Sequence, residues 1–390
     1  MKFPAWLPLL LGFLTAVGPV STDMYLPAFP AIEQALGGQA GTAQATLAAW
    51  FAGLAVGQIT QGTLSDRFGR RWPLVVGTAL YTLATVGCAL APDLPTLSAF
   101  RLISAFGGSA SMVIPRAVVR DLADGHAAAR LMSRLMLVFG VAPILAPTLG
   151  GLVLAFAGWQ AIFWICAGYG AVCCALVALL LPDTLPANRR VKLGLGAMAQ
   201  RYWSILRERG FITHTLLGGG TSFSFFAYLG GSPGVFEEIY HLGPAAYGAV
   251  FGCCATGLIA CSQINPVLVG RFGVSRVLRG SVRVMLAANA TLLVLAFVRP
   301  AQWWVVALAI MVSISTNGFN TPNSTVGALS GHPAHAGSAS ALMGTLQFML
   351  GAVSGLLVGL ASDGTVRPMA ALMFAGALGA NFFDICRPRR

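Results

Sequence analysis

The sequence predicts an all-α integral membrane protein in which twelve transmembrane helices form two pseudo-symmetric bundles of six. Its 390 residues are 56% hydrophobic and only 9% charged, and the mean hydropathy is +0.76. A bilayer solvates this much apolar side chain directly, whereas a soluble domain of the same length has no core large enough to bury it. Apolar segments of about 20 residues, the length of a helix that crosses a bilayer, recur along the whole chain.

The basic residues predict the orientation of the chain in the membrane. Of the 24 Lys and Arg residues, 21 fall on the side of the expected spans that carries both termini. Only Arg299 and Arg367 fall on the other side, and Arg101 lies within a span. Because Lys and Arg are retained in the cytoplasm, we expect cytoplasmic termini. The same scattered pattern argues against nucleic acid as the partner that a net charge of +12 might suggest.

The start of the chain and the uncharged segment 135–182 each allow more than one division into spans. The start of the chain is interpreted as an uncleaved first helix, because the uncharged stretch Phe3–Thr22 is longer than the core of a signal peptide. The segment 135–182 contains no Asp, Glu, Lys or Arg and is too long for one helix, so Gly158-Trp159-Gln160 is predicted to form a tight turn. The expected spans are 5–30, 43–65, 72–91, 94–116, 134–157, 160–181, 211–235, 244–268, 277–298, 302–324, 337–361 and 367–386.

The longest polar connection divides the chain into two halves that share a short repeat. We expect a six-helix bundle at 1–182, a cytoplasmic linker at 183–210 and a second bundle at 211–390. Residues 62–74 align without gaps on residues 266–278, with Leu, Arg, Phe, Gly and Leu at matching positions. A parallel repeat of this kind places a transport site between the halves.

The chain contains no loop of the kind that binds ATP in pumps, and its two lysines, Lys2 and Lys192, are in other contexts. Transport would then be driven by an ion gradient or by the gradient of the substrate itself. No Ser/His/Asp, paired-carboxylate or metal-ligand constellation gathers at one depth. We therefore expect no enzymatic activity, no cofactor and no metal site.

Two charged residues lie clearly within the expected spans. Each costs about 2.5–3.5 kcal/mol on insertion scales, so each is a candidate for function. Asp23 in the first span and Arg101 in the fourth are both about seven residues from the outer end, and therefore at one depth. We interpret Asp23 as a proton carrier whose affinity Arg101 adjusts. A structural ion pair that merely stabilises the first bundle is the alternative.

Several motifs resemble those of one transporter family. The turn Gly62–Arg71 is similar to the loop between the second and third helices of the major facilitator superfamily. The segment Asp23–Pro30 resembles the first-helix signature of its twelve-span drug:proton antiporters, especially the bicyclomycin-resistance group. Arg101 resembles the fourth-helix arginine linked to proton transfer, although Ala105-Phe106 departs from the usual pattern. The resemblance implies the major facilitator fold, a bacterial inner membrane, a monomer, and a small molecule and protons as the transported species.

The fifth expected span also resembles an antiporter motif, with Ala146 where glycine is usual. Its prolines free backbone carbonyls and its glycines let a neighbouring helix approach, which by itself suits a structural or a functional role equally. The motif residues are Gly140, Pro143, Pro147, Gly150 and Gly151.

By the same resemblance, Asp66, Arg70 and Asp121 form a cytoplasmic charge cluster that latches the two halves in the outward-facing state. The alternative is that the arginines serve only to orient the helices. The complete predicted gate is Gly62, Asp66, Arg67, Gly69, Arg70, Arg71, Arg120 and Asp121.

A drug-like substrate requires adaptable apolar walls and a few polar groups. The candidate pocket residues are Tyr25, Phe225, Tyr228, Asn317, Asn320 and Gln347. The resulting hypothesis is a proton-coupled antiporter that exports amphipathic compounds by alternating access. An exporter or facilitator of a polar metabolite such as a sugar is the alternative in the same fold, and a membrane receptor or enzyme is the alternative from another class.

Overall fold

The computed structural model describes residues 6–39, 41–122, 125–186, 190, 195–331 and 336–388, and the described chain folds into helices without a β-strand. The side chains of some helical residues within these ranges, including Arg120 and Gly140, lie outside the description. The predicted all-α class is therefore confirmed.

The first expected span is not one continuous helix. It consists of α1 (Leu7–Thr15), α2 (Val17–Asp23), the 3₁₀ turn η1 (Leu26–Ala28) and α3 (Phe29–Ala35). Prolines at positions 27 and 30 stand at the beginnings of η1 and α3, where they start a helical segment but give no amide hydrogen to the preceding one. The break leaves Asp23 at the end of α2.

The rest of the first half follows the predicted spans closely. Gly158 adopts a φ of 75° inside α7 and divides it into two helices, as the uncharged stretch predicted. The long helices are α4 (Gln44–Phe68), α5 (Arg71–Ala89), α6 (Leu94–Leu122) and α7 (Gly125–Leu180).

The second half begins with a helix that the sequence did not predict, because it lies in the polar linker. This helix, α8 (Leu195–Leu206), turns Ile205 and Leu206 toward a small apolar cluster and leaves Trp203 exposed. The remaining elements are α9 (Arg209–Pro233), the π-helical turn η3 (Gly234–Ile239), α10 (Pro244–Phe272), α11 (Val274–Val298), α12 (Trp303–Ser315), α13 (Asn317–Leu329), α14 (Ala336–Leu360) and α15 (Arg367–Cys386).

Nine stretches of the described residues are long and apolar enough to cross a membrane. One of them, Val141–Leu180, contains the two helices on either side of Gly158. Helices α4 and α9 are outside this set because they are less apolar, yet each has 25 residues and is about 38 Å long. With these helices counted, the fold fits twelve spans.

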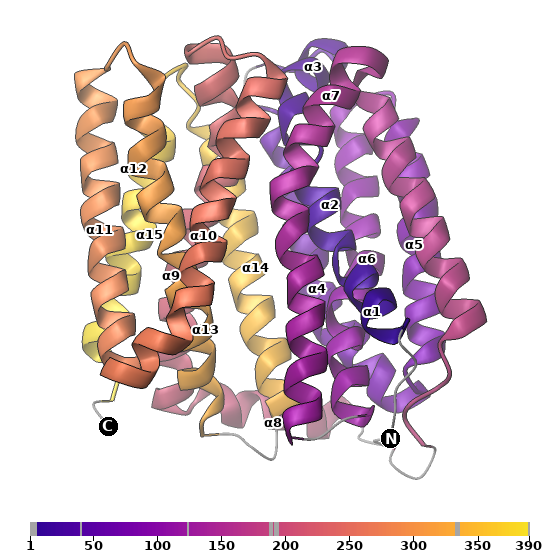
Figure 1. The fold of residues 1–390 in the computed structure, drawn as a ribbon. Coiled ribbons are helices and arrows are strands. Elements are labelled where there is room, and N and C mark those ends of the chain that lie inside the picture. The colour runs from indigo at the N-terminus through magenta and orange to yellow at the C-terminus, as the bar shows by residue number, and fades with distance from the viewer. Residues whose placement is uncertain are drawn as a thin grey trace.

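Helices α1–α7 lie on one side of the molecule and α9–α15 on the other (Figure 1). Across the middle, α4 packs along α14 and α7 packs along α10. We call the lower side in Figure 1, which carries the turn Phe68–Arg71, helix α8 and the end of α15, the terminal face. The opposite side, which carries η3 and the turn before α12, is the far face. The boundaries of the bundles at residues 182 and 210 stay a prediction.

Candidate transport site and gate

Asp23 lies inside the protein at the boundary between the halves. Its side chain is 6% exposed, and no basic group of the described residues forms an ion pair with it within 4 Å. Its carboxyl group interacts electrostatically with the hydroxyls of Tyr228 in α9 and Tyr247 in α10. An acid of the first half therefore lies within electrostatic range of two phenols of the second.

Arg101 is held by aromatic rings rather than by a carboxylate. The residue is 2% exposed, and its Nη1 donates a 3.0 Å hydrogen bond to the carbonyl oxygen of Ser21. The guanidinium carbon lies 4.1 Å from the ring centroid of Tyr25, 4.3 Å from that of Trp50 and 5.7 Å from that of Phe163. Cation–π attraction is strong where water is excluded and offsets part of the burial cost. No protein acceptor within the described residues takes a hydrogen bond from Nε or Nη2.

Asp23 and Arg101 therefore lie near each other in the fold but form no direct ion pair. The arginine contacts the backbone of α2 two residues before Asp23. The assignment of both residues to proton coupling stays a prediction.

The two predicted pocket tyrosines are packed rather than exposed to a cavity. Tyr25 and Tyr228 are each 1% exposed. The Tyr25 hydroxyl shares a 3.1 Å hydrogen bond with that of Thr46, and the Tyr228 ring stacks on Phe251 at 5.5 Å. Phe225 is half-buried, with its centroid 5.6 Å from that of Phe226.

The polar residues of the predicted pocket lie between helices. Asn320 is fully buried and accepts a hydrogen bond from Ser281, which joins α13 to α11. The Asn317 amide donates to the carbonyl of Ile314 at 3.2 Å. Gln347 in α14 faces Gly218 of α9, where an added Cβ would lie 2.8 Å from Nε2. Asn320 therefore serves helix packing here, as buried amides do in membrane bundles.

One amide pair was missed from the sequence. Asn265 of α10 and Asn323 of α13 exchange two hydrogen bonds of 3.4 and 2.8 Å. The available signal was the presence of asparagine within apolar segments, which is costly unless a partner is present.

The fifth-span motif forms a seam of close backbone contacts. A Cβ on Gly150 would lie 1.8 Å from the Met24 carbonyl oxygen, and one on Gly151 would lie 2.7 Å from that of Pro244. Pro147 meets Gly248 of α10 in the same way, because a Cβ on Gly248 would lie 2.9 Å from the Pro147 oxygen. The motif therefore brings α7 against α10 and the segment after Asp23. Pro143 is half-buried in α7, whereas the Gly140 contacts lie outside the described residues.

We expect Gly150→Ala to destabilise the protein by about 1–3 kcal/mol and to reduce transport, since the added methyl group forces α7 away from Met24. Thermal unfolding in detergent and transport in vesicles measure the two effects. Gly168→Ala, in the helix that follows Gly158, is the control, because an added Cβ there meets nothing within 4 Å. Equal behaviour of the two variants would show that the close contact has no role.

The predicted gate forms a charge cluster around Arg70. Its Nε donates to Asp121 at 2.7 Å, and its Nη1 donates to Asp66 at 2.5 Å and to Ser65 at 3.0 Å. The backbone amide of Arg70 donates to Asp183 at 2.8 Å, a partner that the sequence analysis did not include. Arg70 is 5% exposed and the Asp121 side chain 15%, so this pair is largely shielded from water, whereas Asp66 is half-exposed.

The local backbone explains how this cluster forms. Gly69 ends α4 with a φ of 91°, a value that favours glycine, and a Cβ there would lie 1.9 Å from an Asp183 oxygen. Burial alone lowers the pKa of an arginine, but the hydrogen bonds and charges of Asp121 and Asp66 outweigh it and raise the pKa of Arg70. Arg70 is therefore a permanent cation in a ring of acids.

The other predicted gate residues lie around this core. Arg67 is exposed over the Phe68 ring, and Arg71 donates to the carbonyl of Ala178 at the end of α7. Gly62 faces Val113 of α6, and the Arg120 side chain lies outside the described residues. The hydrogen-bond partners given above for Arg70 belong to the first half, except Asp183 at the start of the predicted linker, and they join the α4–α5 turn to α6 and to the segment after α7.

The second half has a different charge cluster at the same face. Gly273 ends α10 with a φ of 79°, matching Gly69, but Val274 stands at the position of Arg70. The charges come from α15 instead, where Asp384 pairs with Arg387 at 2.7 Å and with Arg279 at 3.6 Å.

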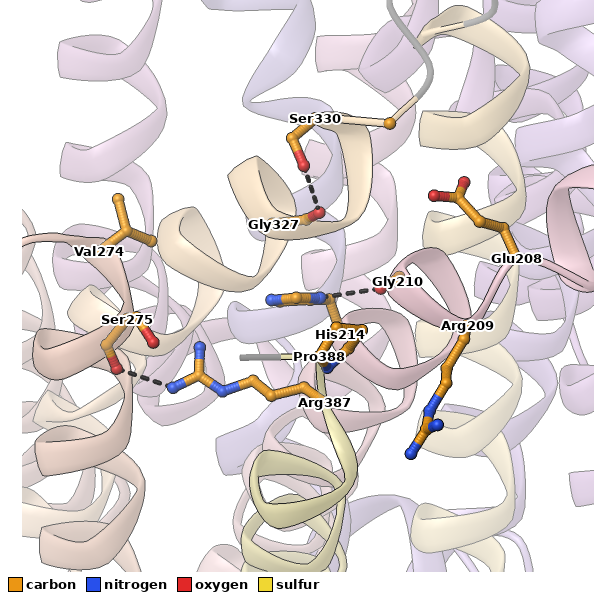
Figure 2. A pocket seen from close by; sticks show the side chains of 11 residues that line it. Glu208, Arg209, Gly210, His214, Val274, Ser275, Gly327, Ser330, Arg387 and Pro388 are labelled. Carbon is orange, nitrogen blue, oxygen red and sulfur yellow. Dashed lines mark hydrogen bonds between the residues drawn. The ribbon is translucent and has the colours of Figure 1, made fainter. Parts of the chain in front are cut away.

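A cavity of about 380 Å³ lies beside this second cluster, between the start of α9, the start of α11 and the end of α13 (Figure 2). Arg387 reaches across it to donate a 2.7 Å hydrogen bond to the Ser275 carbonyl. The His214 ring extends from α9 and holds its Nδ1 2.8 Å from the Gly210 carbonyl. None of the six predicted substrate residues lines this cavity.

Two groups of membrane-crossing helices, with an acid buried at their boundary and an arginine buried within the first group, have the architecture of a polytopic membrane transporter. The chain belongs to the Major Facilitator Superfamily, whose family model matches residues 11–356. It is a transporter of small molecules and not an enzyme.

Relatives with similar sequences extend over almost the whole chain. The chain is 36% identical to the "Uncharacterized MFS-type transporter YdgK" of Bacillus subtilis (strain 168), over 98% of this chain and 96% of the relative. It is 29% identical to the "Bicyclomycin resistance protein homolog" of Haemophilus influenzae, over 94% and 92%. It is 28% identical to the "Chloramphenicol resistance protein" of Pseudomonas aeruginosa, over 93% and 85%.

The fold is also that of solved transporters. The crystal structure of a D-xylose-proton symporter superimposes with a TM-score of 0.75 at 16% identity, over 98% of this chain and 97% of the other. At that identity the likeness shows the fold alone. The predicted superfamily is thus confirmed by the family model and the sequence relatives, two of which are named for drug resistance, and the helical membrane fold is confirmed by structure.

Proposed function

We propose that the protein is a proton-coupled antiporter that exports drug-like amphipathic compounds by alternating access. The observation that carries the proposal is the placement of Asp23, which is 6% exposed and faces Tyr228 and Tyr247 across the boundary between the halves. A carboxyl group there takes up or releases a proton as the packing of the two halves changes around it.

Arg101 supplies the second part of the mechanism. A buried guanidinium beside α2, without a carboxylate partner within 4 Å among the described residues, stabilises negative charge on a nearby acid. It therefore favours proton release from Asp23 when the two groups approach, and favours proton binding when they separate.

The relatives support the substrate class. Two of them are named for resistance to bicyclomycin and to chloramphenicol. The aromatic residues around Tyr228, Phe225 and Phe226 offer the apolar surface that such compounds require, once the halves move apart.

We further propose cytoplasmic termini, a bacterial inner-membrane location and action as a monomer. The basic clusters support this orientation, because the Arg70 turn and the arginines near the end of α15 both lie at the terminal face. The two bundles, 1–182 and 211–390, would rock about the central acid while 183–210 connects them.

Transport by reconstituted protein tests the function. We expect proteoliposomes with an imposed pH gradient to accumulate chloramphenicol or ethidium, and expect the accumulation to stop when a protonophore collapses the gradient. Accumulation that ignores the protonophore would overturn the coupling. Transport of a sugar such as xylose in place of both probes would favour the polar-metabolite alternative.

A further inference from the structure

A second acid lies in a shielded place near the far face. Glu237 is in the π-helical turn η3, past the end of α9, and its Oε1 is buried without a hydrogen-bond partner among the described residues. Burial, aided by the charge of the neighbouring Glu238, raises the pKa of Glu237 to about 9. Glu237 therefore holds a proton at neutral pH. π-Helical turns of this kind interrupt a helix at a local cost and often occur at functional sites.

Buried hydroxyl groups extend from Glu237 toward Asp23. Ser232 and Tyr247, both fully buried, share a 2.8 Å hydrogen bond between their hydroxyls. Tyr247 interacts electrostatically with Glu237 and also with Asp23, so its hydroxyl lies within electrostatic range of both acids.

Tyr228 continues this series on the side of Asp23. Its hydroxyl is buried and has no hydrogen-bond partner among the described residues, although it interacts electrostatically with Asp23. A buried hydroxyl without a partner costs about 1–3 kcal/mol. The Tyr228 hydroxyl lies within electrostatic range of Asp23, so a role in proton transfer would account for this cost.

We propose that Glu237, the Ser232–Tyr247 hydroxyl pair and Tyr228 form the route by which protons from the far face reach Asp23. The inference rests on the proposed proton coupling and adds to it an entry path within the second half.

The proton transfer balances without another reactant. The O–H bond of the Glu237 carboxyl breaks, each hydroxyl accepts a proton on its oxygen and passes its own onward, and a new O–H bond forms on the Asp23 carboxylate. Glu237 is left as a carboxylate and regains a proton from water at the far face. No net charge remains on the hydroxyls, which suits a low-dielectric path.

The ionisable groups packed around η3 are acids and a phenol. The ionisable groups that face it are Glu33 of α3, Tyr247 of α10 and Glu238 of η3 itself.

The test compares Glu237→Gln with Glu238→Gln in proteoliposomes, with chloramphenicol and ethidium as probes and an internal pH dye. We expect Glu237→Gln and Tyr247→Phe to slow probe-driven proton flux about tenfold, and expect Glu238→Gln to stay within about twofold of the wild type. Exchange of labelled for unlabelled probe at equal pH should change less than about twofold in all three variants, because it needs no proton entry.

The outcomes separate this inference from the proposed function. If the wild type moves neither probe against protons, both fall. If the wild type is coupled but Glu237→Gln behaves like Glu238→Gln, only the route falls. If Glu237→Gln slows probe exchange as much as proton flux, its role is structural and the route is wrong.

Discussion

Replacement of Asp23 by asparagine is expected to abolish proton-driven transport while leaving the protein folded. Asparagine has nearly the same shape, and the aspartate makes no ion pair within 4 Å to a described basic group, so little packing is lost. The variant cannot exchange a proton. Loss of one coupled proton removes about 2.3 kcal/mol per 100 mV, which lowers the attainable accumulation ratio about 50-fold for each 100 mV.

The measurement is steady-state accumulation of chloramphenicol or ethidium in proteoliposomes at a fixed membrane potential and pH gradient. Probe exchange without a gradient is the internal control and should survive the substitution. Asp93→Asn in the exposed turn before α6 is the matched variant, because that carboxylate bonds only locally to Thr96 in the described structure. Accumulation by Asp23→Asn equal to that of the wild type would place the coupling site elsewhere.

Replacement of Arg70 by alanine is expected to cause the largest loss of stability among the gate residues. The change leaves the Asp121 carboxylate, which is only 15% exposed, beside Asp66 and Asp183 without the central cation. Removing one partner of a buried pair costs about 3–5 kcal/mol, and the half-exposed Asp66 reduces this to about 2–4 kcal/mol.

Thermal unfolding in detergent measures this effect. Arg67→Ala, three residues earlier and exposed, should cost less than about 0.5 kcal/mol and controls for loss of charge in the turn. Arg70→Lys should recover only part of the loss, because an ammonium group does not reproduce the forked hydrogen bonds to Asp121. If Arg70→Ala and Arg67→Ala unfold at the same temperature, the cluster does not stabilise this face.

Helices whose length and apolar composition match a bilayer span were predictable from the sequence. The span at 94–116 is found within α6, and that at 244–268 within α10, because only a helix satisfies backbone groups inside a bilayer. The division of α7 at Gly158 followed from the length of its uncharged stretch. Helix α8 was missed because its polar face makes it resemble a linker, although apolar residues recur along its other face.

The candidate site was predictable in its residue types but not in its contacts. Asp23 and Arg101 stood out because charge inside a span is rare. That Arg101 rests on the rings of Tyr25, Trp50 and Phe163 depends on three helices far apart in the chain. The contact of Asn320 with Ser281 likewise joins two helices and could not be inferred from the sequence, while its role in binding substrate stays a prediction.

By itself, the sequence determined the membrane as solvent, the positions of the spans, the family and the residue types able to carry charge through the protein. These follow from the length and composition of each segment, because these properties determine whether it inserts into a bilayer and in which orientation. The tertiary structure decided which groups meet: Asp183 at the Arg70 amide, and Tyr228 and Tyr247 around Asp23. Such meetings depend on helix rotation and on close backbone contacts such as that at Gly150, which no single segment specifies.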